Sequence, residues 1–220
     1  MRGSSKSRLP VPVGAIGVGL LLLVMGAWRA AAEPADPQAA ADFLSALQDR
    51  AIVELTDGEA SLDERGERFR RIFRENFDLD AIGKFVIGRY WRSASPQERK
   101  DFLAAFEDVM VHRFLPLLTH YNGEKFKIET SKQDSRNEDM VLVSTRLARD
   151  EGEPYRVNWR IRLRNGSFKV LDIIAEGVSM AITLRSEYNA VLKTSGGSVT
   201  ALTDALREKI ENGELEPKVE

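Results

Sequence analysis

The chain of 220 residues carries 32 basic and 34 acidic side chains, and it contains no cysteine. A formal net charge of −2 argues against a nucleic-acid-binding protein and against a polybasic membrane-surface protein, and the lack of cysteine excludes disulfides and thiolate metal or redox sites. The length suits one domain, which is large enough to fold by packing alone.

The first 32 residues have the pattern of a secretory signal peptide. Three basic residues precede an apolar run at 11–27, and Ala30–Ala32 supply small residues of A-x-A type. The run has 17 residues, fewer than the ~20 that a membrane-spanning helix needs, so cleavage after Ala32 is favoured over an uncleaved anchor. We therefore expect export from the cytoplasm, a single domain at 33–212 and a charged, flexible tail at 213–220.

Helical periodicity dominates the next part of the chain, up to about residue 121. Apolar residues recur at three- and four-residue steps over 43–55 and 69–77, and Asp78 opens a short third helix. The segment Ser95–Glu98 contains a serine cap, a proline at the first helical position and a glutamate that completes a capping box. Pro116 is expected to kink the helix that follows or to end its regular part. One face of that helix carries Phe102, Phe106, Val109, Met110, Phe114 and Leu117.

The period changes to two after Asn122-Gly123, which predicts strands. Asn165-Gly166 is a two-residue hairpin signal before a last strand at 168–175. Every position between the apolar residues of 155–163 is arginine or asparagine, which indicates one face on a core and one face in water. An anion groove and a docking surface for an acidic partner are the alternatives for this basic face. The alternating segments before the hairpin are 126–130, 141–147 and 155–163.

Two helices, expected at 178–193 and 199–210, close the chain on either side of Gly196-Gly197. The order of helices, strands and helices predicts an α+β fold: a curved antiparallel sheet of about four strands packed against N- and C-terminal helices. The apolar rows of the strands and of the 102–117 helix are compatible both with a filled core and with an apolar cavity.

Groups that could carry chemistry are few. His112 and His120 lie eight residues apart without a second ligand at metal-binding spacing, and nucleophile, phosphate-loop and HExxH motifs are absent. Asp172 and Glu176 could form an acid–base pair, but we interpret both as structural. Glu176 precedes Gly177 at a tight turn, where it could accept amide hydrogens from the following helix N-terminus. No metal or cofactor is expected.

The segment Ile173–Leu192, IIAEGVSMAITLRSEYNAVL, resembles the signature of the periplasmic MlaC or toluene-tolerance family of phospholipid carriers. Gly88–Met110, with its aromatic pair and Ser-x-Ser-Pro, resembles the helix entry of the same family. The resemblance covers nearly all of Asp42–Ile210 and includes the glycine pair before the last helix. Leu184 departs from it, because many relatives carry an aromatic residue there.

The resemblance implies a non-enzymatic, periplasmic carrier that holds acyl chains in a cavity between sheet and helices. It implies phospholipid as cargo, an outer-membrane lipoprotein complex and an inner-membrane ABC transporter with an MCE-domain ring as partners, and no cofactor. Carriage of a hopanoid or another polycyclic lipid, as in a related branch, is the alternative; a secreted α+β enzyme is a further one, against which the apolar strand rows argue. The residues expected to face the cavity are Phe106, Met110, Phe114, Leu117, Val141, Val143, Tyr155, Val157, Trp159, Ile161 and Met180.

Overall fold

The computed structural model describes residues 34–118, 125–148 and 152–215. The expected signal peptide, His120 and the end of the charged tail therefore lie outside the described residues. Within the described ranges no helix is long and apolar enough to cross a membrane. The elements are α1 (Pro37–Leu55), α2 (Leu62–Asn76), α3 (Leu79–Ile87), α4 (Tyr90–Ser93), α5 (Pro96–Leu118), β1 (Phe126–Gln133), β2 (Met140–Leu147), β3 (Tyr155–Arg164), β4 (Ser167–Ala175), β5 (Val178–Ser179), α6 (Met180–Thr194) and α7 (Val199–Glu211).

The strands form one antiparallel sheet in the order β1-β2-β3-β4-β5. The α+β prediction is confirmed, with a two-residue fifth strand where the sequence suggested about four. The expected hairpin at Asn165-Gly166 joins β3 to β4, and Glu176-Gly177 makes a second hairpin between β4 and β5. All four turn residues have positive φ, from 47° to 82°, as in type I′ turns. Because of the second hairpin, α6 begins at Met180 and not at Val178.

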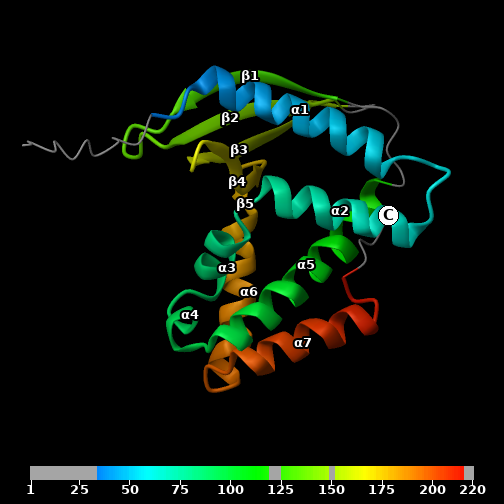
Figure 1. Ribbon diagram of the computed structural model, residues 1–220, viewed down its shortest axis with the longest axis vertical. Coiled ribbons are helices and arrows are strands. Elements are labelled where there is room, and N and C mark those ends of the chain that lie inside the picture. Colours follow the sequence, from blue (N-terminus) through cyan, green and yellow to red (C-terminus); the bar gives the residue numbers. More distant parts are fainter. Residues whose placement is uncertain (1–33, 119–124, 149–151, 216–220) are drawn as a thin grey trace, which may run out of the picture. The chain divides into compact units, whose positions relative to one another are not determined.

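Part of one face of the sheet is buried under α1. Val141 pairs with Ile161 and Val143 with Trp159 across β2 and β3, so these side chains share a face. Leu44 of α1 is fully buried in the same apolar cluster as Val141, Val143 and Ile161. Figure 1 shows α1 running along the sheet. This part of the protein is a filled core.

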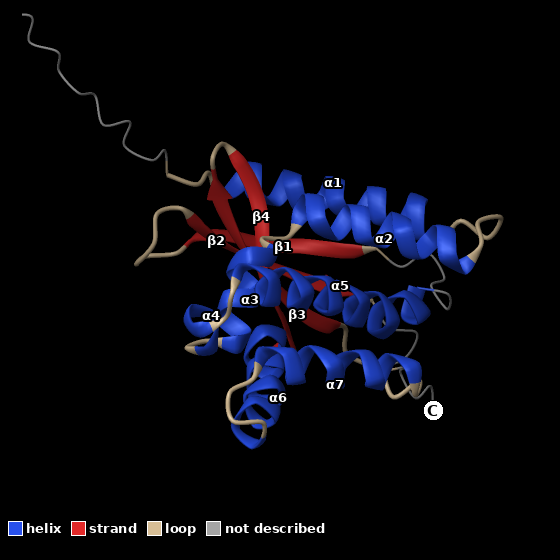
Figure 2. Cartoon of the chain, turned by 60° about the horizontal axis from the view of Figure 1, so that its bottom comes forward, coloured by secondary structure: helices blue, strands red, loops and turns tan. Residues whose placement is uncertain are grey.

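A second core lies among the helices. The rings of Phe102 and Phe106 of α5 are nearly perpendicular to the ring of Tyr188 in α6, and their centroids lie 6.0 and 6.4 Å from its centroid. Phe69 and Phe77, at the two ends of the apolar row of α2, contact both cores. In Figures 1 and 2 the helices α1, α2, α5 and α7 follow one another as neighbours. The helix α2 therefore connects the core under the sheet with the core among the helices.

Local sequence signals explain where α2 and α5 begin. The Ser95 hydroxyl accepts from the Glu98 amide at 3.2 Å, and the Glu98 carboxylate accepts from the Ser95 amide at 2.8 Å, which confirms the expected capping box. Ser61 and Glu64 form a similar box at the start of α2. The helix α5 continues through Pro116 to Leu118, so the proline does not end it at once. A proline in the last turns removes a single helical hydrogen bond, which the long helix tolerates.

The basic face of β3 is largely matched by carboxylates of the same chain. Arg162 and Arg164 converge on Asp78, the N-cap residue of α3, and Arg160 lies 3.4 Å from Asp172. Burial alone would raise the pKa of Asp78, but the hydrogen bonds from Arg164 and Arg162 outweigh it and hold that pKa below its ordinary value. Arg160 and Arg164 are about half exposed, as expected of a solvated face, and together with Arg162 they also attach α3 and the β4–β5 corner to the sheet.

Candidate functional site

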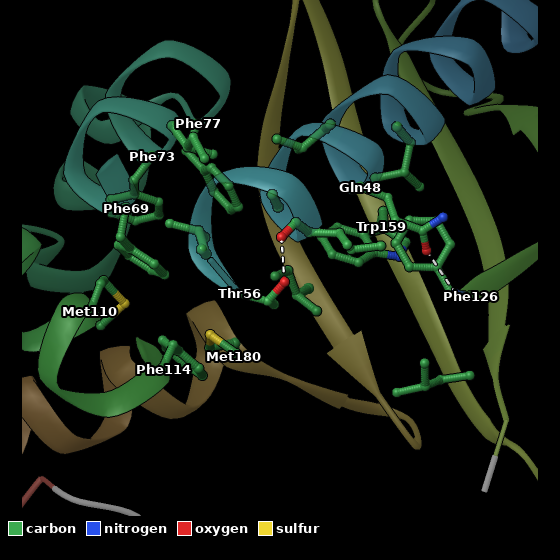
Figure 3. Close-up of a pocket in the computed structure, with 18 residues that line it drawn as sticks. Gln48, Thr56, Phe69, Phe73, Phe77, Met110, Phe114, Phe126, Trp159 and Met180 are labelled. Atoms are coloured by element: carbon green, nitrogen blue, oxygen red, sulfur yellow. Dashed lines mark hydrogen bonds between the residues drawn. The ribbon is translucent and has the colours of Figure 1, made fainter. Parts of the chain in front are cut away.

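An apolar cavity of about 450 Å³ lies between the uncovered part of the sheet, α1, α2, α5 and the start of α6 (Figure 3). In the close-up, the phenylalanines of α2 face Trp159 and Phe126 of the sheet across the cavity. The wall consists of Leu44, Leu47, Gln48, Ala51, Ile52, Leu55, Thr56, Phe69, Ile72, Phe73, Phe77, Met110, Phe114, Phe126, Leu147, Trp159, Ile173 and Met180.

The helices α1 and α2 supply most of the wall. Leu44, Leu47, Ala51 and Leu55 recur at helical spacing, so the apolar stripe of α1 extends beyond the part that packs on the sheet. In α2 and its C-cap, residues 69, 73 and 77 are four apart, and their consecutive ring centroids are 5.9 and 4.6 Å apart. The result is a row of aromatic rings along one side of the cavity.

The polar side chains of the wall bond to their own chain. The Thr56 hydroxyl donates to the Ile52 carbonyl at 2.6 Å, and the Gln48 side-chain oxygen accepts from the Phe126 amide at 2.7 Å. The Trp159 indole donates to the Thr145 hydroxyl at 3.1 Å. These bonds leave mainly hydrocarbon and ring faces toward the cavity, which suits an apolar ligand.

Ion pairs link α1 to α2 beside the cavity. Arg50 contacts Glu54 at 2.6 Å and Glu75 at 2.5 Å, and Arg71 contacts Glu54 at 2.5 Å. The hydrogen bond from Arg50 is the main cause of the lowered pKa of Glu54, and Arg71 adds to it. We name Arg50, Glu54, Arg71 and Glu75 the α1–α2 ion-pair cluster. It holds together the two helices that supply most of the cavity wall.

The structure brings four of the predicted residues together at the cavity: Met110, Phe114, Trp159 and Met180. Phe106, 1% exposed, lies one turn before Met110 in the helical core. Val141, Val143 and Ile161 do not line this cavity. They occupy the correct face of the sheet, but α1 covers that end of the face and fills it.

The remaining three predicted residues, Tyr155, Val157 and Leu117, are not among the described residues that line the cavity. Tyr155, at the start of β3, is 42% exposed. Val157 is half-buried and pairs with Thr145 and Ala175, but it does not line the cavity. Leu117 belongs to the last turn of α5, and its side chain lies outside what the structure describes. The predicted row along β3 thus reaches the cavity only at Trp159.

Sequence reasoning missed the contribution of the first two helices. The stripes over 43–55 and 69–77 were recognised as helical, yet nothing in their spacing indicates which part of the sheet each helix covers. Phe126, Leu147 and Ile173 were also missed, although the first two occupy the alternating rows of β1 and β2. The width of the α1 stripe, which includes Ala51 and Ile52, is the signal that could have identified this helix.

The carboxylates at the β4–β5 corner have structural roles, but in a different arrangement from the expected one. Asp172 accepts from the Ser179 hydroxyl at 2.6 Å and from the Ala181 amide at 3.0 Å, so it is Asp172 that binds the start of α6. Glu176 instead accepts from the Arg156 amide. His112 is exposed, and among the described residues no cluster of histidine and carboxylate side chains could hold a metal ion.

These features define an α+β protein in which helices and an open antiparallel sheet surround an apolar cavity. The chain belongs to the MlaC protein family, whose profile matches residues 45–208. The prediction of this family is confirmed, and with it the prediction that the protein is no enzyme.

Two curated relatives and one solved structure are similar to the chain. The intermembrane phospholipid transport system binding protein MlaC of Haemophilus influenzae is 23% identical over 67% of this chain and 72% of its own. The toluene tolerance protein ttg2D of Pseudomonas putida is 21% identical over 63% of this chain and 64%, just under two thirds, of its own. A phospholipid-binding protein from Ralstonia solanacearum, solved with a phospholipid, shares the fold with a TM-score of 0.71 and 18% identity, over 82% of this chain and 99% of that one.

Proposed function

We propose that this protein is a periplasmic phospholipid carrier, the soluble binding component of an ABC-type transport system that moves lipid between the outer and inner membranes. The observation that carries the proposal is the 450 Å³ cavity, whose polar side chains bond to their own chain. Family membership supports it, as do the transport name of the Haemophilus influenzae relative and the phospholipid held by the Ralstonia solanacearum protein. The expected signal peptide supports the compartment.

Physical chemistry explains why such a cavity suits a carrier. Each methylene group exposed to water costs about 0.8 kcal/mol, so a lipid crosses an aqueous space only when its chains are covered. A carrier must also return its cargo to a bilayer. Because the wall resembles hydrocarbon and makes few polar bonds to a ligand, the free energy of the chains is similar inside the protein and inside a membrane. Transfer in either direction is then possible.

The proposed partners follow from the family. The carrier would exchange lipid with an ABC transporter that has an MCE-domain ring at the inner membrane, and with a lipoprotein complex at the outer membrane. The wall of the cavity is mainly aliphatic and aromatic, and such a wall could also surround a rigid polycyclic lipid such as a hopanoid. Identification of the bound lipid distinguishes a phospholipid carrier from a hopanoid carrier.

Native mass spectrometry of protein purified from the periplasm tests the proposal, with lipid extraction to identify the cargo. Ile52 lines the cavity, whereas the adjacent Val53 is 73% exposed. The affinity of the Ile52→Glu variant for lipid should be lower by about tenfold or more, because losing the burial of two methylenes already weakens binding by about that factor. The Val53→Glu variant should retain it. Wild-type protein without lipid, or equal retention by both variants at unchanged circular dichroism, would refute the proposed carrier.

A further inference from the structure

A cluster of arginine and aromatic side chains lies on the surface around α3, α4 and the facing side of α6. In Figures 1 and 2, α4 lies beside α3 at one end of the helical part of the protein. None of these side chains lines the apolar cavity, so a role in holding lipid does not explain them. We name the cluster the Arg–aromatic surface, and it consists of Phe85, Arg89, Tyr90, Arg92, Arg99 and Arg185.

Two of the arginines stack on aromatic rings of this surface. The Arg185 guanidinium lies 4.8 Å from the centroid of the Phe85 ring and donates to the Phe85 carbonyl at 2.5 Å. The Arg89 guanidinium lies 4.8 Å from the centroid of the Tyr90 ring and donates to the Tyr90 hydroxyl at 2.8 Å. Stacking of this kind orients a guanidinium, and each of these bonds uses only one of its five N–H donors.

Two glycines make room for this arrangement. A Cβ at Gly88, whose φ is 56°, would lie 3.0 Å from Nη2 of Arg185. A Cβ at Gly197 would lie 2.9 Å from the ring of Tyr90. The glycine pair before α7 and the aromatic pair before α5, both visible in the sequence, therefore meet at this surface. Close packing gives its side chains defined positions.

The arginines of this surface lack carboxylate partners within the described ranges. Arg89, Arg92 and Arg185 form no ion pair there. The Arg99 guanidinium donates to the backbone carbonyl of Trp91 at 2.9 Å and stacks over the Trp91 ring. Each arginine of β3, by contrast, contacts a carboxylate. The Arg–aromatic surface thus carries positive charge that the described part of the chain does not neutralise by ion pairs.

The carboxylates on either side of Arg99 in the sequence are engaged by uncharged groups. Glu98 accepts from the Ser95 amide at 2.8 Å, and its other oxygen lies 3.2 Å from the Thr200 hydroxyl. Asp101 accepts from the Gln97 side-chain amide at 2.8 Å. These contacts cap and support the first turns of α5, so the two carboxylates do not serve as partners for the arginines.

Composition and charge together indicate a protein partner with an acidic surface. Arginine and tyrosine are enriched among the residues that dominate protein–protein binding, and a guanidinium binds a carboxylate through two parallel hydrogen bonds. An anionic bilayer fits less well. Aromatic rings that insert into a bilayer need an uncovered apolar face, whereas guanidiniums cover Phe85 and Tyr90, and the net charge of −2 opposes approach to anionic lipid.

We infer that the Arg–aromatic surface is a docking site for a protein that presents carboxylate groups, with Arg89 and Arg92 as its most accessible cations. The inference rests on the proposed function, because it assigns this partner to the membrane proteins that give lipid to the carrier or take lipid from it. Since the surface shares no residue with the cavity wall, docking and lipid binding can be lost separately.

Binding of the purified protein to the two proposed partners, the MCE-domain ring and the outer-membrane lipoprotein complex of the same organism, tests the inference by biolayer interferometry. The Arg92→Glu variant should bind at least one of them about tenfold or more weakly than the wild type, as expected when a central interface arginine is lost. The affinity of the wild type for that partner should fall as the salt concentration rises. Phospholipid retention, followed by native mass spectrometry, should be the same in both proteins.

The Arg136→Glu variant is the matched control, because it makes the same change of charge at an exposed residue between β1 and β2. It should bind both partners as the wild type does. Equal affinities of the two variants, or a wild type that binds neither partner, would overturn the docking site. So would a selective loss by Arg92→Glu of binding to vesicles that contain anionic phospholipid, which would assign the surface to a membrane. Wild-type protein purified without lipid would instead refute the carrier function itself.

Discussion

The Asp172 side chain, only 2% exposed, joins three parts of the protein. It belongs to β4, accepts from the hydroxyl of Ser179 and from the amide of Ala181, and pairs with Arg160 of β3. A buried carboxylate with donors on both oxygens stabilises the junction, because removal of it leaves those donors without partners.

The Asp172→Ala variant is expected to lower the free energy of unfolding by about 2 kcal/mol, since buried donors that lose a charged acceptor cost about 1–3 kcal/mol. Urea denaturation followed by circular dichroism measures this. Glu208→Ala, at an exposed position of α7, is the control and should change stability by less than ~0.5 kcal/mol. A loss no larger than that of the control would contradict the structural role.

Asp78 provides a pH-dependent contribution to stability. Its lowered pKa means that the folded protein keeps the carboxylate ionised at pH values where the unfolded chain already binds a proton. The contribution of its pairs with Arg162 and Arg164 is therefore complete above the ordinary Asp pKa of 3.8, and it is lost as the pH falls below that value through the lowered folded pKa.

The Asp78→Asn variant should be less stable than the wild type at neutral pH, and the difference between the two should shrink as the pH falls below 3.8. Urea unfolding of both proteins at a series of pH values measures that difference. The other carboxylates are the same in both proteins, so their contributions cancel in the difference. A difference that stays constant over this range would show that Asp78 is not held ionised by the two arginines.

At the scale of the elements, α1 has two tasks. Its first half packs on the sheet through residues such as Ala40, and its second half supplies Ala51, Ile52 and Leu55 to the cavity. The second half is attached to α2 by the α1–α2 ion-pair cluster, whose members are about one quarter to one half exposed. Pairs this exposed add little stability, but they restrain the distance between two helices.

The Glu54→Gln variant removes the carboxylate that Arg50 and Arg71 share. We expect a loss of stability of less than ~1 kcal/mol, together with faster exchange of lipid between the protein and vesicles, because α1 separates from α2 more readily. A fluorescent-lipid transfer assay measures the rate. Glu67→Gln, whose pair with Arg70 lies within α2, should leave the rate unchanged, and equal rates in both variants would exclude a restraining role.

At the scale of the whole molecule, sequence patterns predicted the elements better than they predicted the cavity. The capping box at Ser95, the hairpin at Asn165-Gly166 and the alternating strands are local signals, and each corresponds to a structural feature. Val143 and Trp159 show the limit: they are cross-strand partners on the same face, yet one is in a filled core and the other lines the cavity. The distinction depends on where α1 ends and α2 begins over the sheet, which is a tertiary property.

The two type I′ hairpins also have a consequence for the order of folding. They join β3, β4 and β5 through turns of two residues, so these strands meet by closing very short loops, a process that is fast. The helix α1 covers the same sheet but ends a hundred residues before β3 begins, and its docking requires a long chain segment to close. We therefore expect the β3–β5 meander to assemble early and α1 to dock late, so that the part of the cavity wall that α1 supplies forms only in the last stage of folding.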